Sequence, residues 1–92
     1  MTTQDSKISR SRQAVFEALK VAAPGTFSDA LRRSFLEDGL SIQLADLQMD
    51  SLAEMEFCIA IELSSGVTLV PSELAGLSTT DAVEARIRQA LG

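Results

Sequence analysis

The segment with the clearest chemical potential has the sequence LQMDSL and spans residues 47–52. It places Ser51 directly after Asp50, at the start of an apolar stretch with the length and periodicity of a helix. A serine at a helix start exposes its hydroxyl, and the nearby backbone N–H groups can stabilise an attached phosphodiester. Ser51 is therefore the candidate for a covalent attachment point.

The residue types that would let this chain catalyse a reaction by itself are missing. It contains no histidine, and Cys58 is its only cysteine. Neither a Ser-His-Asp nor a Cys-His system can be assembled, a zinc site lacks its usual ligands, and no glycine-rich phosphate loop occurs. We predict a non-catalytic protein without a metal site, in which Cys58 is a small buried residue. Any nucleophilic step at Ser51 then needs a separate enzyme.

The plainest alternative for the same residues is helix initiation. Aspartate and serine are both favourable N-caps, and Ser51 with Glu54 fits the S-x-x-E capping box. Asp50 also suits the positive end of a helix dipole. Such motifs are common, so this pattern alone assigns Ser51 no role beyond starting a helix.

Charge is unevenly distributed along the chain. Residues 34–85 contain no lysine or arginine and ten acids, whereas the other residues hold eight bases and three acids, which gives a formal charge of −5. The ten acids are Glu37, Asp38, Asp46, Asp50, Glu54, Glu56, Glu62, Glu73, Asp81 and Glu84. This stretch disfavours nucleic acid and anionic membranes and favours basic protein partners, with an ordinary solvated acidic surface as the alternative.

Helical periodicity dominates the elements that must position Ser51. A first helix is expected from residue 5 or 6 to 21, ended by Pro24 and Gly25. A shorter, extra helix is expected over residues 28–38, closed by Gly39. Its inward side would comprise Phe27, Ala30, Leu31 and Phe35. Residues 40–49 then form a partly buried loop, with a short strand as the alternative.

The second half of the chain continues this pattern. A central helix is expected from residue 50 or 51 to 64 or 65, a helical turn over 72–77, and a last helix from residue 79 or 80 to 91. Ser78 and Asp81 would cap the last helix, and its inward stripe would comprise Ala82, Val83, Ile87 and Leu91. We predict one all-α domain over residues 1–92, a small bundle of three main helices and one short helix. The long first loop would hold the extra helix, and residues 1–6 would be frayed.

The central helix is apolar on two sides, which is unusual for a surface helix. At 100° per residue, one side carries Leu52, Met55 and Ile59, and the other carries Phe57, Ala60 and Ile61. One side can face the core. The other must meet either the segment 27–35 or a partner protein, and core packing is the simpler explanation from the residues alone.

The motif Asp50-Ser51-Leu52, followed by Glu56 and an apolar helix that ends near Glu62, resembles the acyl carrier protein family. The resemblance extends from about residue 46 to 91, and the first helix matches in pattern only. It implies that Ser51 carries a covalent 4'-phosphopantetheine arm, framed by Asp50 and Leu52. The terminal thiol of that arm would hold acyl groups as thioesters.

The same resemblance implies a carrier for fatty acid, lipid or polyketide biosynthesis, with no enzyme activity of its own. Its partners would be a phosphopantetheinyl transferase and acyl-loading or acyl-processing enzymes that dock through basic patches. Neither nucleic acid binding nor membrane insertion is expected, and the carrier would be a monomer. The implied docking residues are Glu54, Met55, Glu56, Ile59 and Glu62, whereas Phe57 and Ile61 would face the core.

Three departures from the family pattern favour a specialised carrier. Gln48 and Met49 stand where the family usually has glycine and a small residue, Leu63 replaces an often acidic residue, and residues 23–46 form a longer segment than usual. A peptidyl carrier with aminoacyl cargo and an unmodified helical adaptor stay open as alternatives. Because no apolar run of bilayer length, signal-peptide pattern or disulfide framework is present, we expect a cytoplasmic protein.

Overall fold

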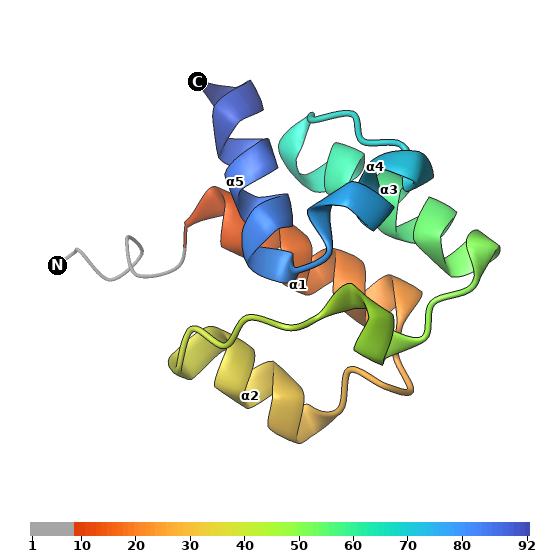
Figure 1. Cartoon of the computed structure of the whole chain (residues 1–92). Coiled ribbons are helices and arrows are strands. Elements are labelled where there is room, and N and C mark those ends of the chain that lie inside the picture. The colour runs from red at the N-terminus through yellow and green to blue at the C-terminus, as the bar shows by residue number, and fades with distance from the viewer. Residues whose placement is uncertain (1–8) are drawn as a thin grey trace, which may run out of the picture.

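The computed structural model describes residues 9–92, and this part of the chain is helical, as predicted (Figure 1). Its elements are α1 (Arg10–Ala22), α2 (Asp29–Glu37), the 3-10 helix η2 (Leu44–Leu47), α3 (Ser51–Ser65), α4 (Pro71–Leu77) and α5 (Thr80–Leu91). No strand forms within these residues, where β pairing is limited to an isolated bridge between Gln43 and Thr79. The all-α fold class is confirmed.

Helix α1 lies at the centre of the bundle and packs against α3, α5 and α2 (Figure 1). It buries a face of small and branched residues, among them Ala14, Val15 and Ala18, which lets its neighbours approach closely. Ser9 caps this helix by accepting the Arg12 N–H at 3.2 Å, so α1 begins at Arg10, later than predicted. The fraying expected for residues 1–6 concerns residues outside the described part.

The extra helix in the first loop is confirmed as α2, and it is anchored by aromatic residues. Phe27 and Phe35 are fully buried, and their ring centroids lie 5.7 and 6.3 Å from that of Phe16 on α1. Ser28 caps the helix, and Gly39 follows it with a φ of +70°, a conformation that favours glycine. Ala30 is exposed, so its predicted place on the inward side is wrong. Phe27 and Phe35 therefore pack in the core, and α2 packs on α1 and not on α3.

The connection between α2 and α3 is a partly buried loop, as expected, with η2 inside it. The loop is fixed to the start of α5 by a reciprocal pair of hydrogen bonds: Ile42 N donates to Thr80 Oγ1, and Thr80 N donates to Ile42 O, both at 2.9 Å. Leu44 N donates to Ser78 O at 2.8 Å beside them. The strand considered for this loop is thus reduced to one bridge, because η2 turns the chain away after Gln43.

The predicted start of α4 and the predicted cap of α5 need correction, whereas α5 begins at Thr80 as expected. Helix α4 begins at Pro71, where the missing proline N–H costs no helical hydrogen bond. Thr79 caps α5 by accepting the Ala82 N–H at 3.2 Å. Ser78 cannot act as that cap because it lies in a tight turn with a φ of +68°, in which Thr79 N donates to Leu77 O at 2.8 Å.

The inward side of α5 also differs from the prediction. Val83 and Ile87 are fully buried, as expected, but Ala82 is only half-buried and Leu91 is exposed. Glu84 is buried instead, because a buried arginine stands opposite it. The buried side of α5 therefore contains an acidic residue, Glu84, although the prediction placed only apolar residues there.

That arginine is Arg12, which joins three parts of the chain. Its Nη1 lies 2.6 Å from Glu84 Oε2, its Nε donates to Phe35 O at 3.0 Å, and its Nη2 donates to Leu40 O at 3.1 Å. The guanidinium also stacks 3.9 Å from the centre of the Phe35 ring. Burial raises the pKa of Glu84, and the neighbouring Arg12 charge opposes that rise. We call this arrangement the Arg12 clasp.

Membrane insertion was not expected from the sequence. Within residues 9–92, none of the helices combines the length and apolar character that a bilayer crossing requires.

Candidate functional site

Ser51 is the first residue of α3, and its side chain is exposed. The cap of this helix is Asp50, which has an extended backbone and accepts the Ala53 N–H on Oδ1 at 2.8 Å. The capping box considered for Ser51 and Glu54 as the alternative explanation is therefore not formed, and the cap lies one residue earlier. Because Asp50 performs the capping, the Ser51 hydroxyl has no part in starting the helix.

The surroundings of this hydroxyl favour an attached anion. The N–H groups of Ser51 and Leu52 belong to the first turn, where a helix offers them no internal partner, and the helix dipole is positive there. Residues 34–85 contain no lysine or arginine, so the side chains near Ser51 in sequence offer neither a positive charge nor an amine base. The donors available to an attached anion are therefore those of the backbone.

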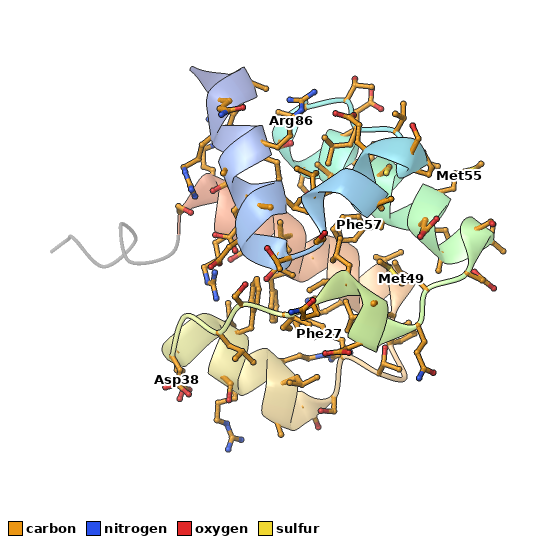
Figure 2. The ribbon with its side chains drawn as sticks, viewed as in Figure 1. Phe27, Asp38, Met49, Met55, Phe57 and Arg86 are labelled. Atoms are coloured by element: carbon orange, nitrogen blue, oxygen red, sulfur yellow. The ribbon has the colours of Figure 1, made fainter. Side chains whose placement is uncertain are left out.

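The two apolar sides of α3 are confirmed. Phe57 and Ile61 are fully buried against the bundle. On the opposite side lies a row of exposed apolar residues, here called the exposed stripe, which consists of Leu52, Met55, Ile59 and Leu63. The side chains of this row are between 51% and 83% exposed, and Figure 2 shows Met55 pointing away from the bundle while Phe57 points into it. Core packing is therefore excluded as the explanation of this stripe.

The acids predicted for the docking surface do not share one face. Glu56 and Glu62 are exposed and flank the exposed stripe. Glu54 is half-buried and lies on the other side of Ser51, about 60° around the helix axis, whereas Met55 lies about 40° away in the opposite sense. Ser51 thus stands on the boundary between two different surfaces of α3.

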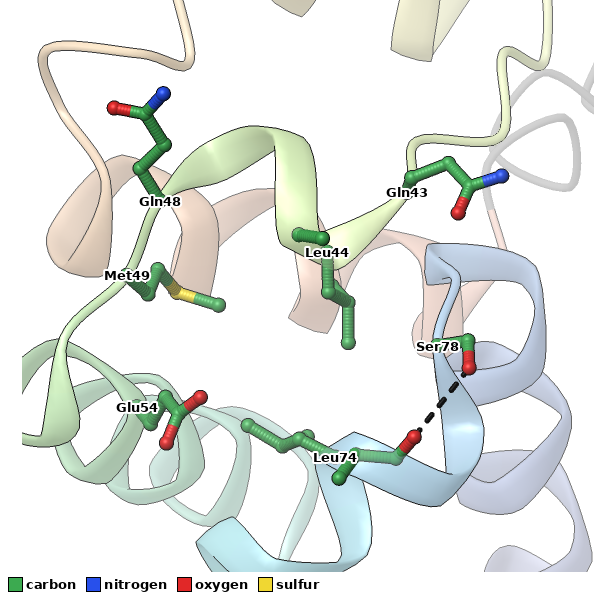
Figure 3. A pocket seen from close by; sticks show the side chains of 9 residues that line it. Gln43, Leu44, Gln48, Met49, Glu54, Leu74 and Ser78 are labelled. Carbon is green, nitrogen blue, oxygen red and sulfur yellow. Dashed lines mark hydrogen bonds between the residues drawn. The ribbon is translucent and has the colours of Figure 1, made fainter.

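Glu54 lines a pocket between η2, the first turn of α3 and the second half of α4 (Figure 3). We call it the Ser51 pocket because Glu54 follows Ser51 by about one helical turn, although Ser51 itself does not line it. Its volume is about 290 Å³. The lining comprises Gln43, Leu44, Ala45, Gln48, Met49, Glu54, Leu74, Ala75 and Ser78. A second pocket of about 230 Å³ lies between α2 and the loop residues 40–47 and has no lining residue from α3.

In the turn before Ser51, a residue other than glycine adopts the left-handed backbone conformation. Gln48 adopts the left-handed conformation, with φ 55° and ψ 41°, at the position where the carrier family usually has glycine. A side chain in this conformation costs roughly 1–2 kcal/mol relative to a right-handed one. Met49, in place of a small residue, is half-buried and forms part of the pocket wall.

Cys58 is buried, as predicted, and is an unsuitable nucleophile. Burial raises the pKa of its thiol, and the negative charges of Glu73 and Glu54 raise it further. The thiol therefore stays protonated at neutral pH, whereas reactive cysteines need a lowered pKa.

Sequence reasoning missed the pocket residues Met49, Leu74 and Ser78, since a loop residue, a helix residue and the residue after a helix gave no common pattern. The one signal was the bulky Met49 where a small residue was expected. No protein-family model, curated protein or solved structure was found to match this chain.

Proposed function

We propose that this protein is an acyl carrier that holds acyl groups as thioesters on a 4'-phosphopantetheine arm attached to Ser51. The observation that carries the proposal is the position of Ser51, exposed at the first turn of α3 and released from capping by Asp50. The motif Asp50-Ser51-Leu52 supports the same role through its resemblance to the carrier family. The proposal assumes a cytoplasmic monomer.

Attachment of the arm would exchange one bond to phosphorus for another. The oxygen of Ser51 attacks the phosphorus that bears pantetheine in coenzyme A, and the bond from that phosphorus to the second phosphate breaks. Adenosine bisphosphate leaves with the electron pair. The hydroxyl proton passes to a base of the phosphopantetheinyl transferase, because this chain lacks histidine and has no basic residue near Ser51 in sequence.

The two surfaces beside Ser51 would serve the two needs of a carrier. The exposed stripe, with Glu56 and Glu62 at its flanks, gives partner enzymes an apolar contact area surrounded by negative charge. Basic patches on acyl-loading and acyl-processing enzymes would be steered to it. The Ser51 pocket would shelter the acyl group between visits to those enzymes.

The test is modification by coenzyme A in the presence of several phosphopantetheinyl transferases, followed by intact mass measurement. We expect the mass of one phosphopantetheine group to be added to the protein. The addition should disappear in Ser51→Ala and persist in Ser64→Ala, which removes another exposed serine from the same helix. No gain with any transferase, or a gain in Ser51→Ala, would overturn the proposal.

A second candidate is an unmodified adaptor that binds a partner helix or groove through the exposed stripe. Leu63 favours it, since this residue is 83% exposed and lies at the end of α3 away from Ser51. Partner binding that survives Ser51→Ala and is lost in Leu63→Gln would support the adaptor. A peptidyl carrier uses the same arm, and the mass of a thioester that co-purifies with the protein would distinguish its aminoacyl cargo.

A further inference from the structure

The polar groups that face into the Ser51 pocket are hydrogen-bond acceptors. The Glu54 carboxylate faces the space between Met49 and Leu74, and the hydroxyl of Ser78 lies at the opposite edge (Figure 3). Ser78 Oγ donates to Ala75 O at 3.4 Å, so its lone pairs remain available to accept. Both inward polar groups are therefore hydrogen-bond acceptors.

The remaining lining gives an apolar floor and no cation. Leu44 and Leu74 are buried, and the amide groups of Gln43 and Gln48 point away from the middle of the pocket (Figure 3). Within residues 9–92, Glu54 takes part in none of the five ion pairs. The base nearest in sequence to the pocket residue Ser78 is Arg86, whose Nε lies 3.2 Å from Glu73.

The backbone around the pocket is also unusual. Among the described residues, Gln48 and Ser78 are the two non-glycine residues with a positive φ, at 55° and 68°. Both line the pocket, one on each side. Strained backbone persists only where the surrounding structure maintains it, and it concentrates at binding and active sites. This observation is independent of the charge of the lining and is consistent with a binding role for the pocket.

We propose that the Ser51 pocket selects short acyl groups that end in a hydrogen-bond donor, an ammonium or a hydroxyl, because Glu54 and Ser78 present only acceptors to it. The selection rests on the proposed carrier function, since the acyl group reaches the pocket on the arm at Ser51. A wholly aliphatic chain leaves the Glu54 carboxylate without a partner. A carboxylate-ended chain places two negative charges in one pocket without a cation, which is unfavourable.

The experiment compares acyl groups of matched shape on the full chain. Coenzyme A analogues carry butyryl, 3-hydroxypropionyl, β-alanyl or succinyl groups through a stable amide, and a phosphopantetheinyl transferase attaches each arm to Ser51. The first three groups have chains of equal length that end in a methyl, a hydroxyl or an ammonium group. Intact mass confirms complete loading, and calorimetry then gives the Tm of each form.

We expect the β-alanyl and 3-hydroxypropionyl forms to melt above the butyryl form and the succinyl form to melt below it. One net hydrogen bond in a domain of this size corresponds to a rise in Tm of about 4–8 °C. Glu54→Gln should remove most of the advantage of the ammonium over the methyl end. Glu56→Gln, which makes the same charge change at an exposed position of α3, should preserve it.

The experiment distinguishes a wrong carrier function from a wrong selection of acyl groups. If no analogue is loaded, the carrier function is overturned, and the selection falls with it. If all analogues load but the three matched groups give equal Tm values, the selection alone is overturned. An ammonium preference that is unchanged in Glu54→Gln also overturns it, because the preference would then arise elsewhere.

Discussion

Asp50 and Ser51 are adjacent residues of similar capping ability, but in the structure only Asp50 caps α3. The extended backbone of Asp50 places its carboxylate over the Ala53 N–H, while Ser51 already has helical geometry. A serine that capped its own helix would have its oxygen occupied by a backbone N–H. The division of tasks leaves the Ser51 hydroxyl available for modification.

This division predicts different costs for two neighbouring substitutions. Asp50→Ala removes the cap of α3 and should lower the free energy of unfolding by about 1 kcal/mol. Ser51→Ala removes an exposed hydroxyl that makes no capping bond, so its effect should stay within about 0.5 kcal/mol. Urea unfolding of the two variants and the unmodified parent measures both values. Equal losses would mean that Ser51 shares in capping.

The element that closes the Ser51 pocket opposite α3 is α4, a helix of only seven residues. A helix this short is unstable by itself and depends on its anchors. Glu73 provides two of them, because it accepts the Val70 N–H at 3.1 Å and the Arg86 Nε–H at 3.2 Å. These bonds fix the start of α4 and join it to α5.

The anchoring of α4 should depend on pH. The Val70 N–H and then Arg86 lower the pKa of Glu73 below its ordinary value. A lowered folded-state pKa means that the folded protein binds fewer protons, so this stabilisation is present above the unfolded pKa of about 4.3 and is lost as pH falls through the folded value. Glu73→Gln should therefore lower the Tm at pH 7, with a difference that shrinks towards about pH 3. Calorimetry across this range, with the exposed Glu62→Gln as the control, tests it; a constant difference contradicts it.

Helix boundaries mark the limit of what the sequence could predict at this scale. The sequence located each α-helix of residues 9–92 but not the 3-10 helix η2, and α3 ends at Ser65 as expected, followed by Gly66 with a φ of +80°. The starts were harder, because Asp50 and Ser51, or Ser78 and Thr79, are adjacent residues that can both cap a helix. The backbone conformation decides between them, and in the second case it depends on hydrogen bonds to the distant residues Ile42 and Leu44.

At the scale of the whole molecule, the Arg12 clasp connects α1, the end of α2 and α5. Its side chains are only 12% and 7% exposed, for Arg12 and Glu84. Charges that are this buried are strongly unfavourable without their partners. The clasp could not be predicted from sequence, because an apolar periodicity gives no place to an acid whose partner lies 72 positions away.

Removal of one partner should therefore lower the free energy of unfolding, by an amount that depends on pH. Arg12→Met leaves the buried Glu84 with only the more exposed Arg88, 3.9 Å away, as a cation, and should lower the free energy of unfolding by about 3 kcal/mol at neutral pH. Since burial already raises the pKa of Glu84 and Arg12 opposes that rise, the variant should raise it further. A raised folded-state pKa of Glu84 gives stability that is present at low pH and is lost as pH rises. The loss of unfolding free energy in Arg12→Met should therefore be smaller in acid than at neutral pH.

Urea unfolding at several pH values measures this deficit. The double variant Arg12→Met, Glu84→Leu removes both charges and should recover much of the loss, because no buried charge then remains unpaired. A single variant as stable as the parent, or a double variant worse than the sum of the two single ones, would contradict the role given to the clasp.

The separation of Arg12 and Glu84 also orders events during synthesis of the chain. The arginine is synthesised early and its carboxylate partner 72 positions later, after Ser51 has been added to the chain. A fragment that stops before Glu84 lacks the carboxylate that pairs with Arg12, so it keeps the α1–α3 contacts but leaves the Arg12 charge without that partner. We expect such a fragment to be less stable than the full chain and to hold Ser51 on a less firmly packed helix.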